Sequence, residues 1–217
     1  VVMQYSGRES QRVLNRWKKG FGHYLACQGY VVINADGRGT GCRGRVWRNE
    51  TYMQLGQKEA EDQISVGHYA AGLPFVDGNR MTIMGWSYGG FEVLMTMSKE
   101  GHPYRCGVAI APVTDYRLYD TGYTERYMRR PQVNEAGYKG CALPEMADKL
   151  TGSLLIVHGL ADDNVHAQNT LLYIDRLVQA GKQFEMQLYV DDNHSMRKVN
   201  NYEHLHRRIM LFLEKNL

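Results

Sequence analysis

Short apolar runs alternate along the chain with segments whose apolar residues recur at helical spacing. Continuous apolar runs of this length are typical of strands in a parallel sheet that is covered on both faces. Strands that alternate with helices predict an α/β fold, with a mostly parallel sheet and helices on both of its faces. The strands are expected at 30–34, 81–84, 107–111, 154–157 and 185–190.

Between these runs, apolar residues spaced by three and four positions predict amphipathic helices. In the last such segment, Leu205, Ile209 and Phe212 recur at intervals of four and three, which gives the helix one apolar face. A further helix is expected somewhere between residues 10 and 27. The other helices are expected at 57–71, 89–100, 167–180 and 201–215.

Two stretches depart from this alternation. Residues 114–150 show no strong period, and we expect them to form an insertion above the sheet. The first five residues, VVMQY, have the pattern of the middle of a strand. We therefore expect the chain to enter the sheet partway, as a fragment from which the first strands are absent.

Composition places the chain among ordinary globular proteins. Its 217 residues amount to about 1.4 average domains, so one large domain is expected. The net charge is +3 and no run of five Lys or Arg occurs, which gives nucleic-acid binding little support. No apolar run approaches the roughly 18 residues of a membrane span.

The four cysteines, Cys27, Cys42, Cys106 and Cys141, lie far apart and form no CxxC pair. A zinc site is therefore not expected. A chain of this length needs no disulfides for its stability, so the redox state of these thiols stays open.

The sequence GWSYGG at 85–90 follows a predicted strand and precedes a predicted helix. This is the G-x-S-x-G pattern, in which the serine occupies a strained, sharp turn and larger side chains at the glycines would collide with neighbouring backbone. The turn would raise the Ser87 hydroxyl above the edge of the sheet. It would also aim the amides that follow, at a helix N-terminus, toward an oxyanion.

A serine nucleophile needs a histidine base and a carboxylate, which in this fold follow in the order Ser, acid, His. The predicted strands that end near 157 and 190 are followed by HGLADDNVH at 158–166 and by DDNHS at 191–195. Ser87, an aspartate at 162 or 163, and His194 thus occur in the required order. A metal site at 158–166 is not expected, because no third partner has metal-ligand spacing.

Several segments together resemble the prolyl oligopeptidase family of serine peptidases. They are GWSYGG at 85–90, DGRGTG at 36–41 and ADDNVH at 161–166, and YDTGYTERYM at 119–128 narrows the resemblance to the dipeptidyl peptidase IV branch. The resemblance runs from about Tyr5 to the C-terminus. It implies an α/β-hydrolase catalytic domain, incomplete here over residues 1–217, with a β-propeller domain expected upstream.

The resemblance also assigns roles that the residues alone leave open. It implies that Asp162, rather than Asp163, is the acid, with Ser87 as nucleophile and His194 as base. It places the oxyanion hole at the amide of Tyr88 and the hydroxyl of Tyr5. Arg8 stands where the family usually has proline after glycine, which is a departure in the loop that positions Tyr5.

A pocket for a proline ring should have aromatic walls, because the ring is flat, apolar and without an amide hydrogen. Tyrosines in the insertion could instead simply pack it, and Tyr116 stands where relatives often have tryptophan. By resemblance, Asn164 would hydrogen-bond a substrate carbonyl. The pocket walls would be Val113, Tyr116, Tyr119, Tyr123 and Val165.

The function that the resemblance implies is a serine exopeptidase that releases X-Pro or X-Ala dipeptides from peptide N-termini through an acyl-enzyme. The alternatives are an acylaminoacyl peptidase, a carboxylesterase, or a catalytically silent binding relative. Peptides with Pro or Ala at the second position are the expected partners, a second copy of the chain is a further candidate, and no cofactor or metal is expected. Relatives are often secreted, periplasmic or membrane-anchored. Dipeptide release should require the propeller, which in such enzymes grips the free amino group.

Overall fold

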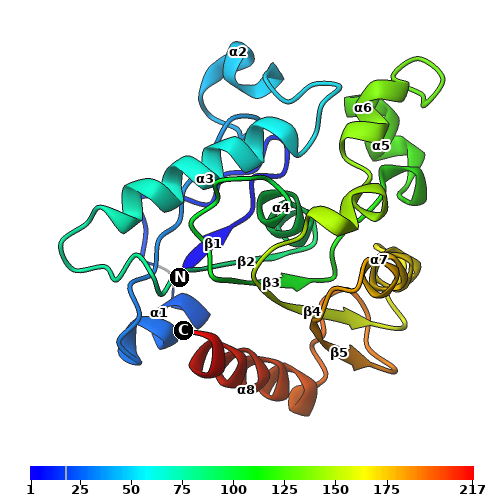
Figure 1. Ribbon diagram of the computed structural model, residues 1–217. Coiled ribbons are helices and arrows are strands. Elements are labelled where there is room, and N and C mark those ends of the chain that lie inside the picture. Colours follow the sequence, from blue (N-terminus) through cyan, green and yellow to red (C-terminus); the bar gives the residue numbers. More distant parts are fainter. Residues whose placement is uncertain (18) are drawn as a thin grey trace.

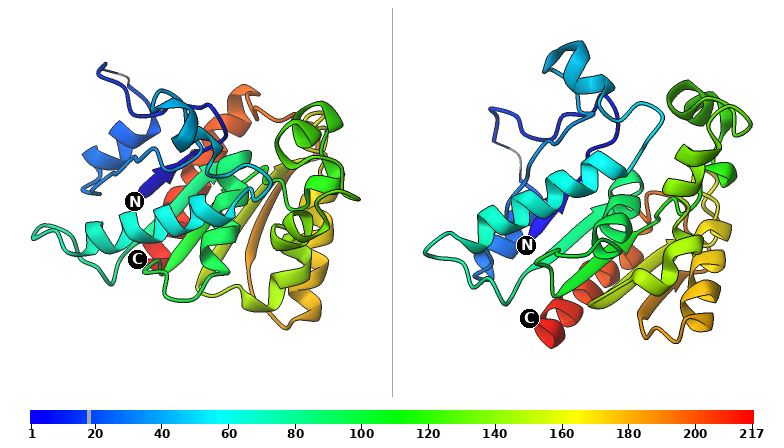
Figure 2. Two further views of the ribbon diagram at one scale, coloured as in Figure 1. Left: turned by 90° about the horizontal axis from the view of Figure 1, so that it is seen from above. Right: turned by 45° about the horizontal axis from the view of Figure 1, so that its top comes forward.

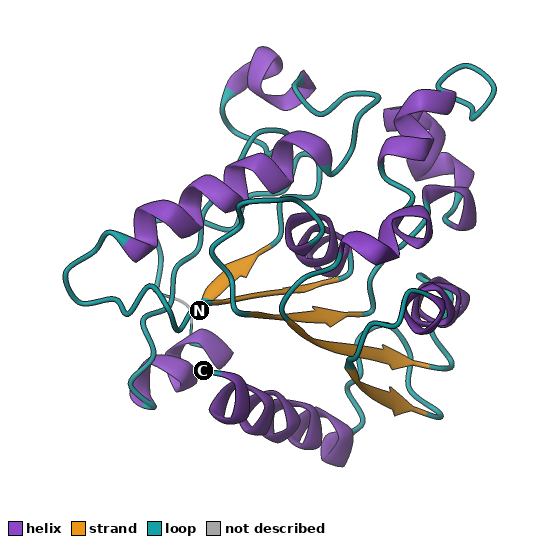
Figure 3. Ribbon diagram, in the orientation of Figure 1, coloured by secondary structure: helices purple, strands orange, loops and turns teal. Residues whose placement is uncertain are grey.

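Five parallel strands form one sheet at the centre of the computed structural model, which describes residues 1–17 and 19–217 (Figure 3). Their spatial order follows the chain, and every neighbouring pair is parallel. This confirms the parallel α/β fold. The strands are β1 (Val2–Gln4), β2 (Thr82–Trp86), β3 (Cys106–Ile110), β4 (Ser153–Gly159) and β5 (Glu185–Tyr189).

Helices cover both faces of the sheet (Figure 1). Helices α3 (Gln57–Ala71), α4 (Tyr88–Met97) and α7 (Gln168–Gln179) lie on one face, and α1 (Phe21–Cys27) and α8 (Val199–Asn216) lie on the other. Each face therefore holds its own apolar core. Because side chains alternate along a strand, Leu154 joins the core under α3, α4 and α7, while Leu155 joins the core that includes α8.

The middle strands are buried on both faces, which is why their sequences are continuous apolar runs. Every residue of β3 is buried, and so is every residue of β4 after Ser153. The helix expected at 57–71 has these bounds in the structure, and the later helices differ from expectation by one to three residues at each end.

The strand expected at 30–34 does not form. This segment makes only one bridge to the sheet, between Val2 and Ile33, and residues 30–33 are partly exposed. Its partner, β1, is three residues long and forms the edge of the paired sheet. Three backbone hydrogen bonds join residues 1–3 to residues 31–33, and among the described residues pairing does not extend beyond them. An apolar run predicts burial, and the strand assignment failed because pairing also depends on the neighbour.

The helix expected between residues 10 and 27 is confined to α1. Residues 10–17 form irregular structure, and Lys18 lies outside the described residues. The loop is held through its backbone, since the amides of Arg12 and Val13 donate to the carboxylate of Asp36 at 2.9 Å. A loop of this kind carries no periodic signal in the sequence.

The segment 114–150 forms a helical insertion that begins beyond the carboxyl end of β3 and returns to the amino end of β4 (Figure 2). Its helices are short, and two of them begin at polar caps: Asp120 accepts from the Tyr123 amide at 2.8 Å, and Asn134 accepts from the Gly137 amide at 3.2 Å. These caps define helices that are too short to show a hydrophobic period. The helices are η1 (Tyr116–Leu118), α5 (Thr121–Met128), α6 (Glu135–Gly140) and η2 (Leu143–Lys149).

In the described part of the chain, no helix has both the length and the apolar character needed to cross a membrane. The four cysteines are free thiols: Cys106 and Cys141 are buried, and Cys27 and Cys42 are exposed.

Candidate active site

The turn between β2 and α4 carries Ser87 in a strained conformation. Its φ of 60° and ψ of −120° lie in a region that side-chain-bearing residues rarely adopt. The Ser87 amide donates to the carbonyl of Ile110 at 2.7 Å, which fixes the turn to the end of β3. Backbone strain of this kind is retained where the surrounding structure enforces it, and it clusters at functional sites.

Close backbone packing accounts for the glycines of the turn. A Cβ on Gly85 would overlap the backbone of Gly89, and a Cβ on Gly89 would lie 2.5 Å from the carbonyl oxygen of Gln4. Neither obstacle is the end of a flexible side chain. The pattern G-x-S-x-G thus follows from how closely β1, β2 and α4 approach one another here.

We expect Gly85→Ala to destabilise the protein by about 2–3 kcal/mol, lowering its melting temperature by roughly 5–10 °C, because the added methyl meets backbone. Thermal unfolding of the complete gene product measures this. Gly20→Ala is the control, since a Cβ there meets nothing within 4 Å and φ is 173°. Equal melting temperatures for the two variants would contradict the packing argument.

His194 and Asp162 meet at the carboxyl ends of β4 and β5. His194 Nδ1 lies 2.7 Å from Asp162 Oδ2, and the Asp162 side chain is fully buried. The other oxygen of Asp162 accepts from the amides of Asn164 and Val165, at 3.0 and 2.9 Å. The carboxylate is thereby held in one orientation toward the imidazole, as a base-orienting acid must be.

His158, at the end of β4, supports the acid from below. It is completely buried, and its Nε2 lies 2.8 Å from the carbonyl of Val165 and 3.3 Å from Asp162 Oδ2. A carbonyl only accepts, so Nε2 carries a proton, and Nδ1 accepts from the Thr170 hydroxyl at 2.7 Å. His158 is not among the predicted site residues. The sequence signal for its role is a histidine at the end of a buried apolar strand.

The pKa of Asp162 lies well below its ordinary value. Burial alone would raise this pKa, but hydrogen bonds from His158 and His194, and the charge on a protonated His194, outweigh burial. Asp162 is therefore an anion throughout the neutral range, where it can stabilise an imidazolium at His194.

The loop of His194 is joined to the serine turn through Trp86. The Trp86 indole Nε1 donates to the His194 carbonyl at 2.9 Å, and Trp86 directly precedes Ser87. Within the described residues, no hydrogen bond links the Ser87 hydroxyl to His194. Ser87 and His194 are both partly exposed, so both are accessible to a substrate at this edge of the sheet.

Tyr5 and Tyr88 lie beside the serine turn, with ring centroids 6.1 Å apart. The Tyr88 side chain points inward and donates to Glu59 Oε1 at 2.6 Å, while its amide stands at the first residue of α4. Burial, and then the charge of Glu92, raise the pKa of Tyr5. The Tyr5 hydroxyl therefore stays protonated at neutral pH and is able to donate a hydrogen bond.

Arg8, which stands where the resembled family usually has proline, packs against aromatic rings. Its guanidinium lies 4.8 Å from the ring centroid of Tyr127 and 5.4 Å from that of Tyr52. Its Nη2 donates to Asn49 Oδ1 at 2.5 Å. These contacts tie the loop after Tyr5 to the insertion and to the segment that follows α2 (Gly44–Asn49).

A row of tyrosines leads from the serine turn into the insertion. The ring centroids of Tyr116 and Tyr119 are 6.5 Å apart, and those of Tyr119 and Tyr123 are 5.5 Å apart. The Tyr119 hydroxyl donates to Asn164 Oδ1 at 2.8 Å, which links the insertion to the loop of Asp162. The expected pocket residues thus gather on one side of the site.

The expected pocket residues differ in exposure. Tyr119 and Tyr123 are partly exposed and Asn164 is exposed, so these three can meet a substrate directly. Tyr116 is only 1% exposed, and its ring packs against Tyr88 and Phe91. Together with Val113 and Val165, which are also buried, it lies under the surface layer.

The model of the prolyl oligopeptidase family matches residues 21–217. The chain belongs to the prolyl oligopeptidase family. It is 44% identical over 200 residues to a probable dipeptidyl-aminopeptidase B of Pyrenophora teres f. teres, covering 90% of this chain and 22% of that protein. It is 42% identical over 213 residues to the dipeptidyl-aminopeptidase B of Aspergillus niger, covering 96% and 24%.

Two solved structures are similar to this prolyl oligopeptidase family chain over its whole length. The crystal structure of Porphyromonas gingivalis dipeptidyl peptidase 4 superposes with a TM-score of 0.97 at 50% identity, and the match covers 31% of that chain. A putative dipeptidyl aminopeptidase IV from Bacteroides ovatus superposes with a TM-score of 0.92 at 35% identity, again over 31% of its chain. The chain spans about a quarter of the length of the curated relatives it matches.

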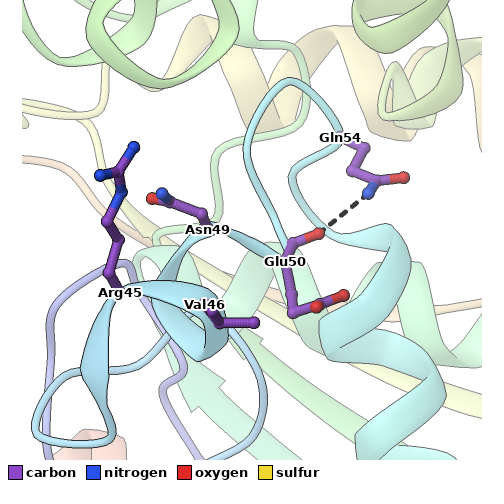
Figure 4. A pocket seen from close by; sticks show the side chains of 5 residues that line it. All are labelled: Arg45, Val46, Asn49, Glu50 and Gln54. Carbon is purple, nitrogen blue, oxygen red and sulfur yellow. Dashed lines mark hydrogen bonds between the residues drawn. The ribbon is translucent and has the colours of Figure 1, made fainter.

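One open recess of this family member lies beside α2 (Figure 4). It has a volume of about 550 Å³ and is bordered by α2 and the loop after it. No expected site residue contributes to it; the lining residues are Arg45, Val46, Asn49, Glu50 and Gln54. Within the described residues, no group of three or more His, Cys, Asp or Glu side chains is arranged to hold a metal ion.

Proposed function

We propose that the protein carrying this chain is a serine dipeptidyl peptidase that releases X-Pro or X-Ala dipeptides from peptide N-termini. The observation that carries the proposal is the 2.7 Å hydrogen bond that His194 Nδ1 donates to the buried carboxylate of Asp162, beside the strained turn of Ser87. The similarity to dipeptidyl-aminopeptidases and to dipeptidyl peptidase 4 supports the dipeptide-releasing reaction.

In the proposed mechanism, the Ser87 hydroxyl attacks the carbonyl carbon of the second substrate residue, and His194 Nε2 takes its proton. Asp162 holds the imidazole through Nδ1 and stabilises the cation that forms. The tetrahedral oxyanion accepts hydrogen bonds from the Tyr88 amide and the Tyr5 hydroxyl. The imidazolium then protonates the leaving amine as the C–N bond breaks, leaving an acyl-enzyme on Ser87.

The second half of the reaction repeats these roles with water. His194 removes a proton from a water molecule as its oxygen attacks the acyl carbon, and the imidazolium returns that proton to Ser87 as the ester bond breaks. The partly exposed rings of Tyr119 and Tyr123 suit a proline or alanine side chain at the second position. The Asn164 side chain lies beside them and suits a substrate carbonyl.

The reaction class is tested by comparing three substrates with the complete gene product. We expect hydrolysis of Gly-Pro-p-nitroanilide and a rate about a hundredfold lower for the N-acetylated compound, because acetylation removes the charged amine that an exopeptidase recognises. Equal rates for both would show that the free amine is not recognised, which would contradict a dipeptide-releasing exopeptidase and favour a peptidase that accepts blocked N-termini, as an acylaminoacyl peptidase does. If p-nitrophenyl acetate were the only one of the three substrates to be hydrolysed, the result would favour a carboxylesterase. If none of the three were hydrolysed, it would favour a catalytically silent binding relative.

A further inference from the structure

Two glutamates lie in the interior beneath the serine turn, and none of the contacts that hold the triad involves them. Glu59 belongs to α3 and Glu92 to α4, and both are 0% exposed. Neither carboxyl forms an ion pair with any residue that the structure describes. An isolated buried charge is costly, so a buried carboxyl without a cation is more stable when it binds a proton.

Each glutamate is bonded to one side of the proposed oxyanion hole. Glu59 Oε1 accepts from the hydroxyl of Tyr88 at 2.6 Å, and Glu92 Oε2 accepts from the amide of Ser6 at 3.3 Å. Ser6 directly follows Tyr5, so Glu92 holds the turn that presents the Tyr5 hydroxyl. Gln63 extends the cluster by donating to the Ser6 hydroxyl at 3.3 Å.

Three buried oxygens of this cluster have no hydrogen-bond partner among the described residues: Glu59 Oε2, Gln63 Oε1 and Glu92 Oε1. The Gln63 amide nitrogen already donates to the Ser6 hydroxyl. An ionised carboxylate only accepts, whereas a protonated carboxyl is also a donor. Protonation of the glutamates therefore supplies donors to the buried oxygens that lack a partner. Ionisation of both glutamates removes these donors.

The ionisable groups that face the pair do not supply a compensating cation. On α3, Asp62 forms an ion pair with Arg38 at 2.7 Å. The Arg38 guanidinium therefore neutralises Asp62 and not the two glutamates. The remaining neighbours are acids or phenols: Tyr88 on α4, Tyr5 after β1, Tyr116 in η1 and Tyr123 in α5. The guanidinium of Arg12 lies over the Tyr5 ring, 5.7 Å from its centroid.

Burial first, and then the mutual repulsion of the two carboxyls and the charge of Asp62, raise the pKa of Glu92 well above its ordinary value. Burial is also the main cause that raises the pKa of Glu59 to about 7. The direction is the same for both glutamates, and it agrees with the lack of donors in the cluster.

We propose that Glu59 and Glu92 are positioning residues, which in their protonated form hold Tyr88 and the Tyr5–Ser6 turn in place for the oxyanion hole. The role rests on the proposed function, because it presumes that Ser87 generates an oxyanion beside these residues. As the pair ionises with rising pH it must draw water or open, and the donors that it positions then move away from the oxyanion.

The pair also links stability to pH. A carboxyl whose pKa is raised by folding costs stability as pH rises from the unfolded value, near 4.5, through the folded value. This loss begins near pH 4.5 and continues past pH 7. Glutamine in place of each glutamate cannot ionise, so the variant escapes the loss and should melt higher than wild type at pH 9, with a smaller difference at pH 5.

The test measures the rate at which an uncharged fluorophosphonate labels Ser87 in the complete gene product, from pH 6 to pH 10. This probe has no amino group to titrate and needs no dipeptide specificity. We expect the wild-type rate to fall about tenfold from its maximum to pH 10, within the hundredfold or more that loss of an oxyanion donor can cost. The double variant Glu59→Gln/Glu92→Gln should fall less than twofold over the same range.

Glu61→Gln is the matched control, because Glu61 lies on α3 beside Glu59 but is 44% exposed in a surface ion pair with Arg38. It should retain the wild-type profile. Glu92→Gln alone serves if the double variant fails to fold, and should shift the alkaline midpoint by more than half a pH unit. The same alkaline fall in wild type and the Gln variants would overturn the proposal. Labelling of Ser87 without release of dipeptides would instead overturn the proposed function and leave this test valid.

Discussion

Ser87→Ala is expected to lower kcat for Gly-Pro-p-nitroanilide on the order of a millionfold while leaving the fold intact. Alanine removes the attacking oxygen but keeps the backbone that bonds to Ile110 at 2.7 Å. Steady-state hydrolysis by the complete gene product measures the loss, with circular dichroism to verify folding.

Ser195→Ala is the matched control for this experiment. Ser195 follows the proposed base, is exposed, and makes its described hydrogen bond through its amide, to Asn193 Oδ1. Its activity should stay within about twofold of wild type, as expected for a surface substitution. Full activity in Ser87→Ala would contradict the assignment of the nucleophile.

Asp162→Asn is expected to lower kcat by about ten-thousandfold. The amide has nearly the shape of the carboxylate, but its nitrogen can donate to Nδ1 of His194 and so stabilise the wrong tautomer of the base. It also loses the negative charge that stabilises the imidazolium. Both effects are measured in the pH profile of kcat for the Asp162→Asn variant of the complete gene product, compared with that of wild type.

Asp163→Asn separates this effect from a general change of charge in the same loop. Asp163 is exposed, and its side chain makes no hydrogen bond to any described residue. We expect less than a twofold change in kcat for this variant. Comparable losses in the two variants would mean that the loop's net charge, rather than the bond to His194, is what matters.

The sequence predicted the centre of the sheet well because the central strands are buried on both faces. A run such as residues 154–157 has little alternative to a central strand, and β3 and β4 lie where such runs occur. Prediction failed at the edge, where residues 30–33 meet only the three-residue β1. The strand that pairs with an edge segment comes from a distant part of the chain. The local pattern of apolar residues therefore does not show whether such a partner is present.

For the site, the motif located the serine turn, but the choice between Asp162 and Asp163 needed more than spacing. In the structure, the two amides bonded to Asp162 Oδ1 turn its other oxygen toward His194. That orientation depends on the backbone conformation of the loop. Asp162 and Asp163 are adjacent in this loop, so their positions in the sequence do not show which of them faces His194. Family resemblance supplied the choice, and the geometry gives its physical reason.

The buried glutamates were missed because charged residues in helices are normally solvent-exposed. Signals for both were present in the sequence. Glu92 interrupts the apolar segment FEVLMTM, and every residue of α4 is buried. Glu59 lies four positions before Gln63 and so shares the buried face of α3.

Ser87 is the proposed nucleophile of a serine dipeptidyl peptidase. The most direct test of this assignment is to treat the complete gene product with a fluorophosphonate and to locate the adduct by peptide mapping, while following hydrolysis of Gly-Pro-p-nitroanilide. We expect one adduct, on Ser87, with activity lost in proportion to labelling. An adduct on another residue, or full hydrolysis after Ser87 is labelled, would contradict it.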